Sequence, residues 1–233
     1  MESMTIESSI QNVRRSIHET AVNANRDPGS IQLVIVTKTI SPEKILKAYR
    51  TGEKDFGENR VQEWREKKDA LPGDIRWHLI GHLQTNKVKY VIGQIALIHS
   101  LDRFELADEI EKQARFKGIA EVPCLVQVNM SGEESKSGLD PAHIVDFVRQ
   151  MPLRSSIKIR GLMSIGPLTE DEGRIRECFR KARKLQGDLK KEFSQYGWDI
   201  LSMGMSADYR IAIEEGANML RIGSLVFPRD TKQ

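Results

Sequence analysis

The sequence predicts an α/β fold: a single (β/α)8 barrel of the TIM type with an extra N-terminal helix. Two observations predict it. Eight short segments with the apolar, β-branched character of strands recur along the chain, and a segment with helical character follows each of the first seven. Strands that alternate with helices pair in parallel through crossover connections, and about 200 residues accommodate eight such units in a closed barrel.

An amphipathic helix is expected first, at residues 4–25, because Ile6, Ile10, Val13 and Ile17 recur at three- and four-residue spacing. The expected strands then cover residues 31–37, 54–57, 76–81, 95–100, 122–129, 157–164, 199–204 and 218–224. The helices between them are expected at residues 41–52, 58–71, 83–93, 102–118, 140–151, 170–193 and 206–216. From residue 31 onward the chain therefore repeats one strand and helix unit.

Several of these helices carry signals at their ends. Ser41 is a typical N-cap, Pro42 suits the first helical turn, and Gly52 lies just past the end of the same helix. Asp102 is the expected N-cap of the helix at 102–118, and Ser206 is a candidate cap for the helix that starts near it. These residues support helices at the stated positions.

Residues 1–233 are expected to form one domain, with the N-terminal helix at 4–25 and the barrel at 31–227. The chain shows no linker and no low-complexity tract. An open, doubly wound sheet is the alternative fold. The turn after the first strand lacks the GxGxxG pattern of dinucleotide-binding sheets, which favours the barrel.

The composition excludes several classes of protein. The chain has 36 Lys and Arg against 33 Asp and Glu, interspersed as on solvated helix faces. Nucleic-acid binding is therefore not expected, and only a pI near 8.8 keeps it as a competing class. Cys124 and Cys178 lack the spacing of a zinc motif, and they give no disulfide scaffold. With no apolar signal segment and no membrane span, a cytoplasmic protein is expected.

The stretch LVIVTK, residues 33–38, ends a buried strand on a lysine. Alternate residues of a strand share a face, so Val34, Val36 and Lys38 point the same way. If the valines fill the barrel, Lys38 points into its mouth, at the face where such barrels carry their active sites. A neutral amine there is a nucleophile that forms a Schiff base with a carbonyl. A lysine that extends into solvent is the alternative.

The loops after the seventh and eighth strands of such barrels often bind phosphate. Here Ser206 and Ser224 offer hydroxyls, Gly223 lets the backbone approach closely, and amides at a helix start favour anions. An ordinary exit from the strand is the alternative for RIGS at 221–224. Arg221 lies on the last strand, which neighbours the strand of Lys38 in a closed barrel. Together these groups suggest pyridoxal phosphate.

Two further patterns are weaker. HLIGH places His78 and His82 four residues apart, which is a zinc spacing on a helix. The stretch is strand-like and lacks HExxH, so no metal site is predicted. SKSG at 135–138 suits an anion-binding loop or a plain polar crossover, and the crossover is favoured.

Seven uncommon stretches occur in order: VTKT, FGENRVQE, WHLIGHLQTNK, VNMSGEESKSG, GLMSIG, LSMGMSADY and RIGSLVF. With them the chain resembles the pyridoxal-phosphate homeostasis proteins, which look like the N-terminal barrel of alanine racemase standing alone. The resemblance covers nearly the whole chain. It implies these cofactor-binding residues: Lys38 as the Schiff-base lysine, Asn59 near the ring, Met163 in the pocket wall, Arg221 at the pyridine nitrogen, and Ser206, Gly223 and Ser224 at the phosphate.

The resemblance implies a protein that carries or buffers pyridoxal 5'-phosphate in vitamin B6 and amino-acid homeostasis, with little or no catalysis. A permanent cation such as Arg221 disfavours a proton on the pyridine nitrogen and weakens the electron sink. Alanine racemase takes a second base, a tyrosine, from a C-terminal domain. This chain ends at Gln233, so that base is expected to be missing and little or no racemase activity is expected.

A pyridoxal-phosphate-dependent amino-acid racemase is the alternative, with Tyr209 as a conceivable second base, although an exposed helix position is favoured for it. The expected partners are the cofactor and, as acceptors, apo-enzymes that use it. A monomer or weak dimer is expected, with no catalytic residues, no metal, no nucleic acid and no membrane.

Overall fold

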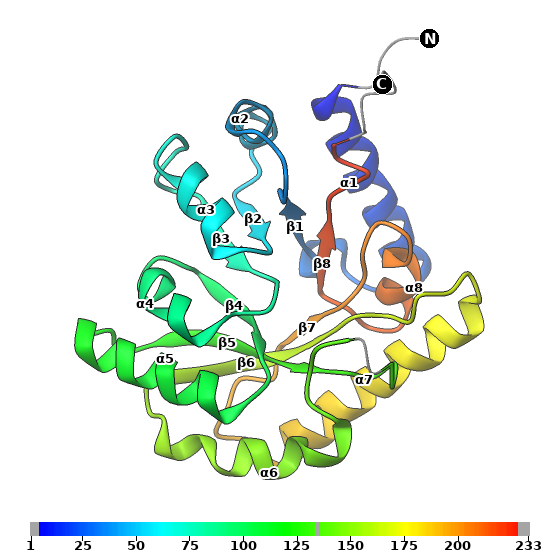
Figure 1. The fold of residues 1–233 in the computed structure, drawn as a ribbon. Coiled ribbons are helices and arrows are strands. Elements are labelled where there is room, and N and C mark those ends of the chain that lie inside the picture. Colours follow the sequence, from blue (N-terminus) through cyan, green and yellow to red (C-terminus); the bar gives the residue numbers. More distant parts are fainter. Residues whose placement is uncertain (1–4, 134–135, 228–233) are drawn as a thin grey trace.

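The protein is described by a computed structural model, which covers residues 5–133 and 136–227. Eight parallel strands close into a barrel in chain order, β1 to β8, and helices surround them (Figure 1). The strands are β1 Gln32–Val36, β2 Asp55–Glu58, β3 Arg76–Leu79, β4 Leu97–Leu101, β5 Val122–Val128, β6 Ile157–Ser164, β7 Ile200–Ser202 and β8 Met219–Ile222. The predicted fold class and all eight predicted strands are confirmed, and the open-sheet alternative is excluded.

Closure of the barrel brings the first and last strands together. Val34 of β1 pairs with Arg221 of β8, and Ile35 pairs with Phe56 of β2 on the other side. Because side chains alternate along β1, Ile35 packs in the apolar layer under the helices, while Val34 lies in a second apolar cluster inside the barrel. The alternation that the sequence predicted for this strand is therefore confirmed.

The helices largely follow the predicted segments. They are α1 Ile6–Asn23, α2 Pro42–Arg50, α3 Val61–Lys68, α4 Val88–Val91, α5 Phe104–Lys117, α6 Ile144–Arg149, α7 Glu172–Glu192 and α8 Tyr209–Glu214, with 3-10 turns η1 Pro28–Ser30, η2 Thr85–Lys87, η3 Pro141–His143 and η4 Met151–Leu153. The expected helix at 83–93 is reduced to η2 and the short α4. Gly93, with φ of 79°, follows it in the left-handed conformation that glycine adopts readily.

Two predicted caps are wrong and one is right in position. α5 starts after Arg103, and the carboxylate of Asp102 instead pairs with the Arg103 guanidinium at 2.6 Å. α8 starts after Asp208, so Ser206 lies too early to cap it. Ser41 is the N-cap residue of α2, although its side chain makes no capping hydrogen bond.

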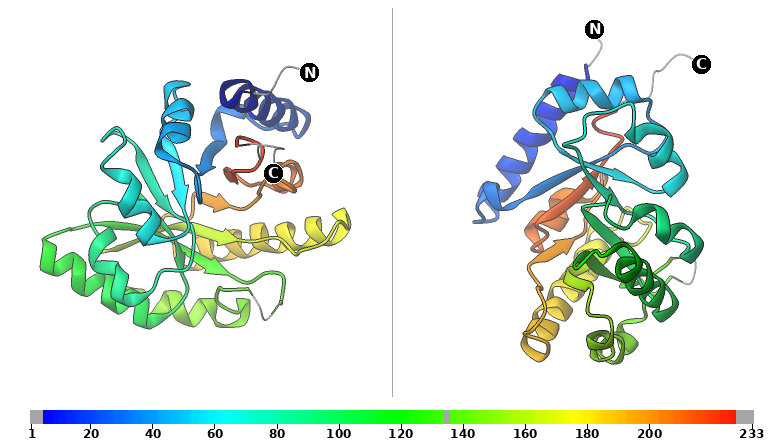
Figure 2. Two further views of the ribbon diagram at one scale, coloured as in Figure 1. Left: turned by 45° about the horizontal axis from the view of Figure 1, so that its top comes forward. Right: turned by 90° about the vertical axis from the view of Figure 1, so that its left-hand side faces the viewer.

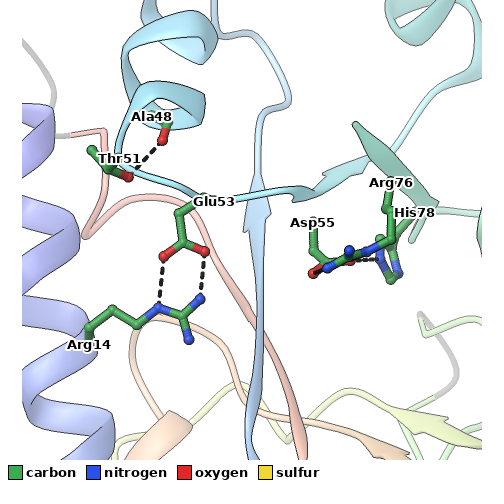
Figure 3. Close-up of polar contacts among 7 residues, drawn as sticks. All are labelled: Arg14, Ala48, Thr51, Glu53, Asp55, Arg76 and His78. Atoms are coloured by element: carbon green, nitrogen blue, oxygen red, sulfur yellow. Dashed lines mark hydrogen bonds and ion pairs between the residues drawn. The ribbon is translucent and has the colours of Figure 1, made fainter. Parts of the chain in front are cut away.

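The N-terminal helix α1 lies against the outside of the barrel, where it contacts α2 and α8 (Figure 2). Thr5 caps it by accepting a hydrogen bond from the Ser8 amide at 3.1 Å. The Arg14 guanidinium donates to both carboxylate oxygens of Glu53, at 2.7 and 2.5 Å, which ties α1 to the start of β2 (Figure 3). No described helix has the length and apolar character needed to cross a bilayer.

Candidate functional site

A cavity of about 670 Å³ opens at the C-terminal ends of the strands. Six of the seven residues that the sequence singled out contribute to its wall: Lys38, Asn59, Ser206, Arg221, Gly223 and Ser224. They come from β1, β2, β7 and β8 or from the residues that follow these strands. The closed barrel therefore gathers positions that lie up to 186 residues apart, since the set runs from residue 38 to residue 224.

Lys38 lies two residues after β1, next to Val36 in the cavity wall. Its side chain is exposed. In the part of the chain that the structure describes, its ammonium has no hydrogen-bond or salt-bridge partner. The lysine thus combines the two alternatives weighed from sequence, because it is accessible to solvent and also faces the cavity.

The backbone directly before Lys38 is held by a buried ion pair. Glu58 at the end of β2 binds the Lys67 ammonium at 2.8 Å and accepts a hydrogen bond from the Thr37 hydroxyl at 2.6 Å. The same ammonium donates to the Thr37 carbonyl oxygen at 2.9 Å. Burial raises the pKa of Glu58, and the contacts from Lys67 and Thr37 oppose this shift. The pair fixes the residue that precedes Lys38.

The residue that follows Lys38 is strained. Thr39 has φ of 62°, in the left-handed region that a β-branched residue rarely adopts. Its amide donates to the Glu63 carboxylate at 2.9 Å. Such strain persists only where the surroundings impose it. Contacts from α3 on both sides of Lys38 therefore set the exit angle of its side chain.

Asn59 lies opposite Gly81, and the two backbones touch. A Cβ atom on Gly81 would be 2.3 Å from the Asn59 carbonyl oxygen, far inside contact distance. Only glycine fits there without a shift of the Asn59 backbone, and both residues line the cavity.

Arg221 is buried on β8 with 4% of its surface exposed, yet it reaches the cavity floor. Its guanidinium donates to the Ser202 hydroxyl at 2.6 Å and to the Ser164 carbonyl oxygen at 2.9 Å. Burial lowers the pKa of Arg221 to about 10, while the Asp208 carboxylate acts in the opposite direction. The side chain therefore stays cationic at neutral pH in a fixed orientation.

Two turns at the cavity wall have the features of an anion site. In the first, Met205 accepts backbone hydrogen bonds from Asp208 and Tyr209; in the second, Gly223 accepts them from Val226 and Phe227. Among the described backbone contacts none uses the amides of Ser206, Ala207 or Ser224. Free amides at the start of a helical turn attract anions, and two serine hydroxyls lie beside them.

Met163 is the predicted site residue that does not contribute to the cavity wall. It is fully buried in the cluster inside the barrel, with Val34, Leu97, Leu125 and Met219. Met163 lies on β6 itself, opposite Gln127 of β5. Gln127 does contribute to the wall.

The sequence analysis missed several residues of the wall. Lys136 and Ser137 line the cavity, together with His82 and Gln127. The Lys136 ammonium donates to the Gly166 carbonyl oxygen at 2.6 Å, which joins the loop after β5 to the loop after β6. The SKSG stretch was the available signal, since two of its residues line the cavity, although a plain polar crossover was favoured for it. Its first residue, Ser135, lies outside the described residues.

The remaining candidates lie apart from the cavity or from each other. His78 is buried in the barrel, whereas His82 is at the cavity wall. The described residues contain no cluster of potential metal ligands. Tyr209 is neither exposed nor at the cavity, because it is buried and its hydroxyl donates to Ser16 of α1 at 2.7 Å. The expectation of an exposed Tyr209 is wrong.

Fold and cavity define a class of protein: a (β/α)8 barrel with a lysine after the first strand, an arginine on the last, and two anion-suited turns beside them. The family model of the alanine racemase N-terminal domain matches residues 15–228. A pyridoxal phosphate homeostasis protein of Aquifex aeolicus is 43% identical over 219 residues, 94% of this chain and 95% of the relative. One of Helicobacter pylori is 40% identical over 200 residues, 84% and 87% of the two chains. The chain belongs to the pyridoxal phosphate homeostasis protein family.

Solved structures agree with this assignment. PipY of Synechococcus elongatus, whose structure is known without and with bound pyridoxal phosphate, is 35% identical and covers 91% of this chain and 99% of its own. Its TM-scores are 0.82 without and 0.79 with the cofactor. Alanine racemase of Clostridium difficile, at 16% identity and a TM-score of 0.70, shares the barrel, and this chain covers 57% of it.

Proposed function

We propose that this protein binds pyridoxal 5'-phosphate in the main cavity, holds it reversibly on Lys38, and stores or delivers it without turning over amino acids at enzymatic rates. The observation that carries the proposal is the convergence of Lys38, Arg221 and the turns at Ser206 and Ser224 on one cavity. The names of the relatives and the cofactor bound to PipY support it.

The residues present fit this cofactor. A cavity of about 670 Å³ is within the usual range for a small ligand. The turns at Ser206 and Ser224 suit a phosphate dianion, and Gly223 leaves little room for a side chain between β8 and β1, since a Cβ there would approach the Val36 carbonyl oxygen to 3.0 Å. Asn59 in the same cavity wall offers an amide to the edge of an aromatic ring.

Bound pyridoxal phosphate supplies an aldehyde that an amine captures reversibly as an imine, and a ring that can withdraw electrons. Lys38 is the amine assigned to that capture. Its exposed side chain leaves it open to water and to competing amines. This openness supports exchange of the cofactor with solvent and with apo-enzymes as acceptors, which a storage and delivery role in vitamin B6 homeostasis requires.

Arg221 is assigned to the pyridine nitrogen. A guanidinium can only donate hydrogen bonds and cannot release its proton at neutral pH. It therefore favours an unprotonated ring nitrogen, which weakens electron withdrawal from a bound amino acid. This supports retention of the cofactor over carbanion chemistry.

The racemase alternative loses its candidate base. The Tyr209 hydroxyl is engaged with Ser16 on the outer side of the barrel. Lys136 and His82 are the ionisable side chains at the wall besides Lys38 and Arg221, among the described residues. Interconversion of L- and D-alanine at enzymatic rates by the purified protein would overturn the proposal of a carrier.

The proposal is tested by borohydride reduction and peptide mapping. The loaded protein should be yellow, lose the absorption band on reduction, and carry the reduced adduct on Lys38. Lys38→Ala should abolish the band, whereas Lys136→Met, which alters a second lysine of the same wall, should keep it. A colourless wild-type protein that takes up no cofactor, or a wild-type adduct on another residue, would sink the proposal.

A further inference from the structure

A row of five buried polar side chains crosses the barrel interior below the cavity. It runs from Arg221 on β8 through Ser202 on β7, His99 on β4 and His78 on β3 to Asp55 on β2. The successive distances are 2.6 Å from Arg221 Nη1 to Ser202 Oγ, 3.2 Å from Ser202 Oγ to His99 Nδ1, 3.0 Å from His99 Nε2 to His78 Nδ1, and 3.0 Å from His78 Nε2 to Asp55 Oδ1. We call these five residues the polar row.

The polar row connects two opposite faces of the barrel. Arg221 contributes to the main cavity at the C-terminal ends of the strands. Asp55 and His78 line a smaller cavity of about 230 Å³, together with residues at the starts of β1, β3, β4 and β8. Figure 3 shows this end, where the Asp55 carboxylate contacts both His78 and the Arg76 guanidinium, which binds it at 2.8 and 2.5 Å.

With both rings neutral, the Asp55 carboxylate fixes the direction of every hydrogen bond in the row. A carboxylate only accepts and a guanidinium only donates. His78 therefore holds its one ring hydrogen on Nε2 and donates it to Asp55, and its Nδ1 accepts from His99.

The same argument applies to His99. Its hydrogen is on Nε2 and is donated to His78, so its Nδ1 accepts from the Ser202 hydroxyl, whose oxygen accepts from Arg221. With neutral rings this one arrangement of hydrogens satisfies all four contacts, and both histidines are Nε2–H tautomers. A proton added to His99 would place N–H groups on both sides of the ring, and its contact with the Ser202 hydroxyl hydrogen would be lost.

The electrostatics of the row agree with this arrangement. Burial lowers the pKa of His99 well below its ordinary value, and the charge of Arg221 acts in the same direction. Burial alone would raise the pKa of Asp55, but hydrogen bonds from His78 and Arg76 hold it well below its usual range. These shifts favour a neutral His99 ring between a cation, Arg221, and an anion, Asp55.

We propose that the polar row is a positioning device for Arg221: the Asp55 carboxylate at one face of the barrel fixes the hydrogens of His78 and His99, and these hold Ser202 and the Arg221 guanidinium in place under the cavity at the other face. Asp55, His78, His99 and Ser202 are then positioning residues that never touch a ligand in the cavity. The inference rests on the proposed function only where cofactor binding is the readout.

The first test needs no cofactor. Long-range nitrogen–proton NMR spectra of the intact protein at pH 7 should show both His78 and His99 as neutral Nε2–H tautomers. Asp55→Asn keeps the shape but removes the charge, and it should mix the tautomers of His99, two contacts away. A Nδ1–H tautomer or an imidazolium at His99 in the wild type would overturn the proposal, even if Asp55→Asn failed to fold. A His99 signal unmoved by Asp55→Asn would also overturn it.

The second test is a double-mutant cycle on the dissociation constant of pyridoxal phosphate, read from its absorption band. Substitutions at residues that share no contact normally combine within a factor of about two. Asp55→Asn and Ser202→Ala lie at different positions of the row, and we expect their effects to deviate from the product by at least a factor of about three. Independent effects of these two substitutions on the dissociation constant would contradict the coupling along the polar row.

Asp74→Asn serves as the control in the same cycle. Asp74 is a carboxylate near the same face that pairs with Lys54 at 2.6 Å, outside the row. The effects of Asp74→Asn and Ser202→Ala on the dissociation constant should simply multiply. Coupling between these two as large as that between Asp55→Asn and Ser202→Ala would count against the polar row. If the wild type bound no pyridoxal phosphate, the proposed function would fail while the tautomer experiment still decided the inference.

Discussion

The Lys67 ammonium lies 2.9 Å from the carbonyl oxygen of Thr37, the residue directly before Lys38. It also lies 2.8 Å from the carboxylate of Glu58, and that carboxylate is 1% exposed. One buried cation on α3 thus neutralises an acidic group and orients the strand end that leads into Lys38.

The first prediction concerns this pair. Lys67→Met leaves Glu58 buried without a counter-charge, and loss of one partner of a buried pair costs about 3–5 kcal/mol of unfolding free energy. Urea denaturation measures the loss, and adding Glu58→Gln to Lys67→Met should recover part of it. Lys68→Met is the matched control, because Lys68 pairs at the surface with Asp69 and such pairs contribute about 0–1 kcal/mol. Equal losses for Lys67→Met and Lys68→Met would refute the role of the pair.

The second prediction concerns the contact between Gly81 and Asn59. A methyl group on Gly81 would overlap the Asn59 carbonyl oxygen, so Gly81→Ala should cost about 1–3 kcal/mol and weaken cofactor binding by displacing Asn59. Thermal unfolding and cofactor titration measure the two effects. Gly73→Ala, where nothing lies within 4 Å of the new carbon, should leave cofactor affinity unchanged. Unaltered cofactor affinity in Gly81→Ala would show that Asn59 does not contribute.

The third prediction concerns pH. The pKa of His99 is lowered in the folded state by burial, with further contributions from His78 and Arg221. In the unfolded chain His99 therefore takes up a proton near pH 6.5, whereas in the folded chain it stays unprotonated at that pH. Stability is present above that pH and should fall by about 1.4 kcal/mol per pH unit below it. Urea denaturation between pH 8 and pH 5 measures the slope, and His99→Gln should reduce it. An identical slope in that variant would contradict the prediction.

The fourth prediction separates the carrier from the racemase. Tyr209→Phe removes the hydrogen bond to Ser16, and it should cost about 1 kcal/mol of stability. Any slow exchange of the Cα proton of alanine for deuterium should stay at the wild-type rate, because the hydroxyl lies outside the cavity. A rate that dropped at least about tenfold, equivalent to 1.4 kcal/mol in the barrier, would restore Tyr209 as a base.

Much of the candidate site was predictable because it depends on local periodicity. Side chains alternate along a strand, so the apolar Val34 and Val36 indicated the direction of Lys38 before any fold was known. The count of eight strand and helix units placed Lys38 at the end of β1 and Arg221 on the neighbouring β8. Met163 was expected at the pocket from the family resemblance, and the structure places it in the apolar cluster inside the barrel. The depth of a side chain inside a barrel depends on the stagger between strands, which the sequence does not give.

The sequence by itself determined the eight strand and helix units, the lysine after the first strand and the two anion-suited turns, because each depends on a short-range pattern. Tertiary structure alone decided that Lys136 joins the cavity wall, that Tyr209 faces α1, and that His99 and Ser202 connect Arg221 to Asp55. These contacts join residues from 19 positions apart, between Ser202 and Arg221, to 193, between Ser16 and Tyr209. Their pairing follows from barrel closure and register, which no local spacing contains.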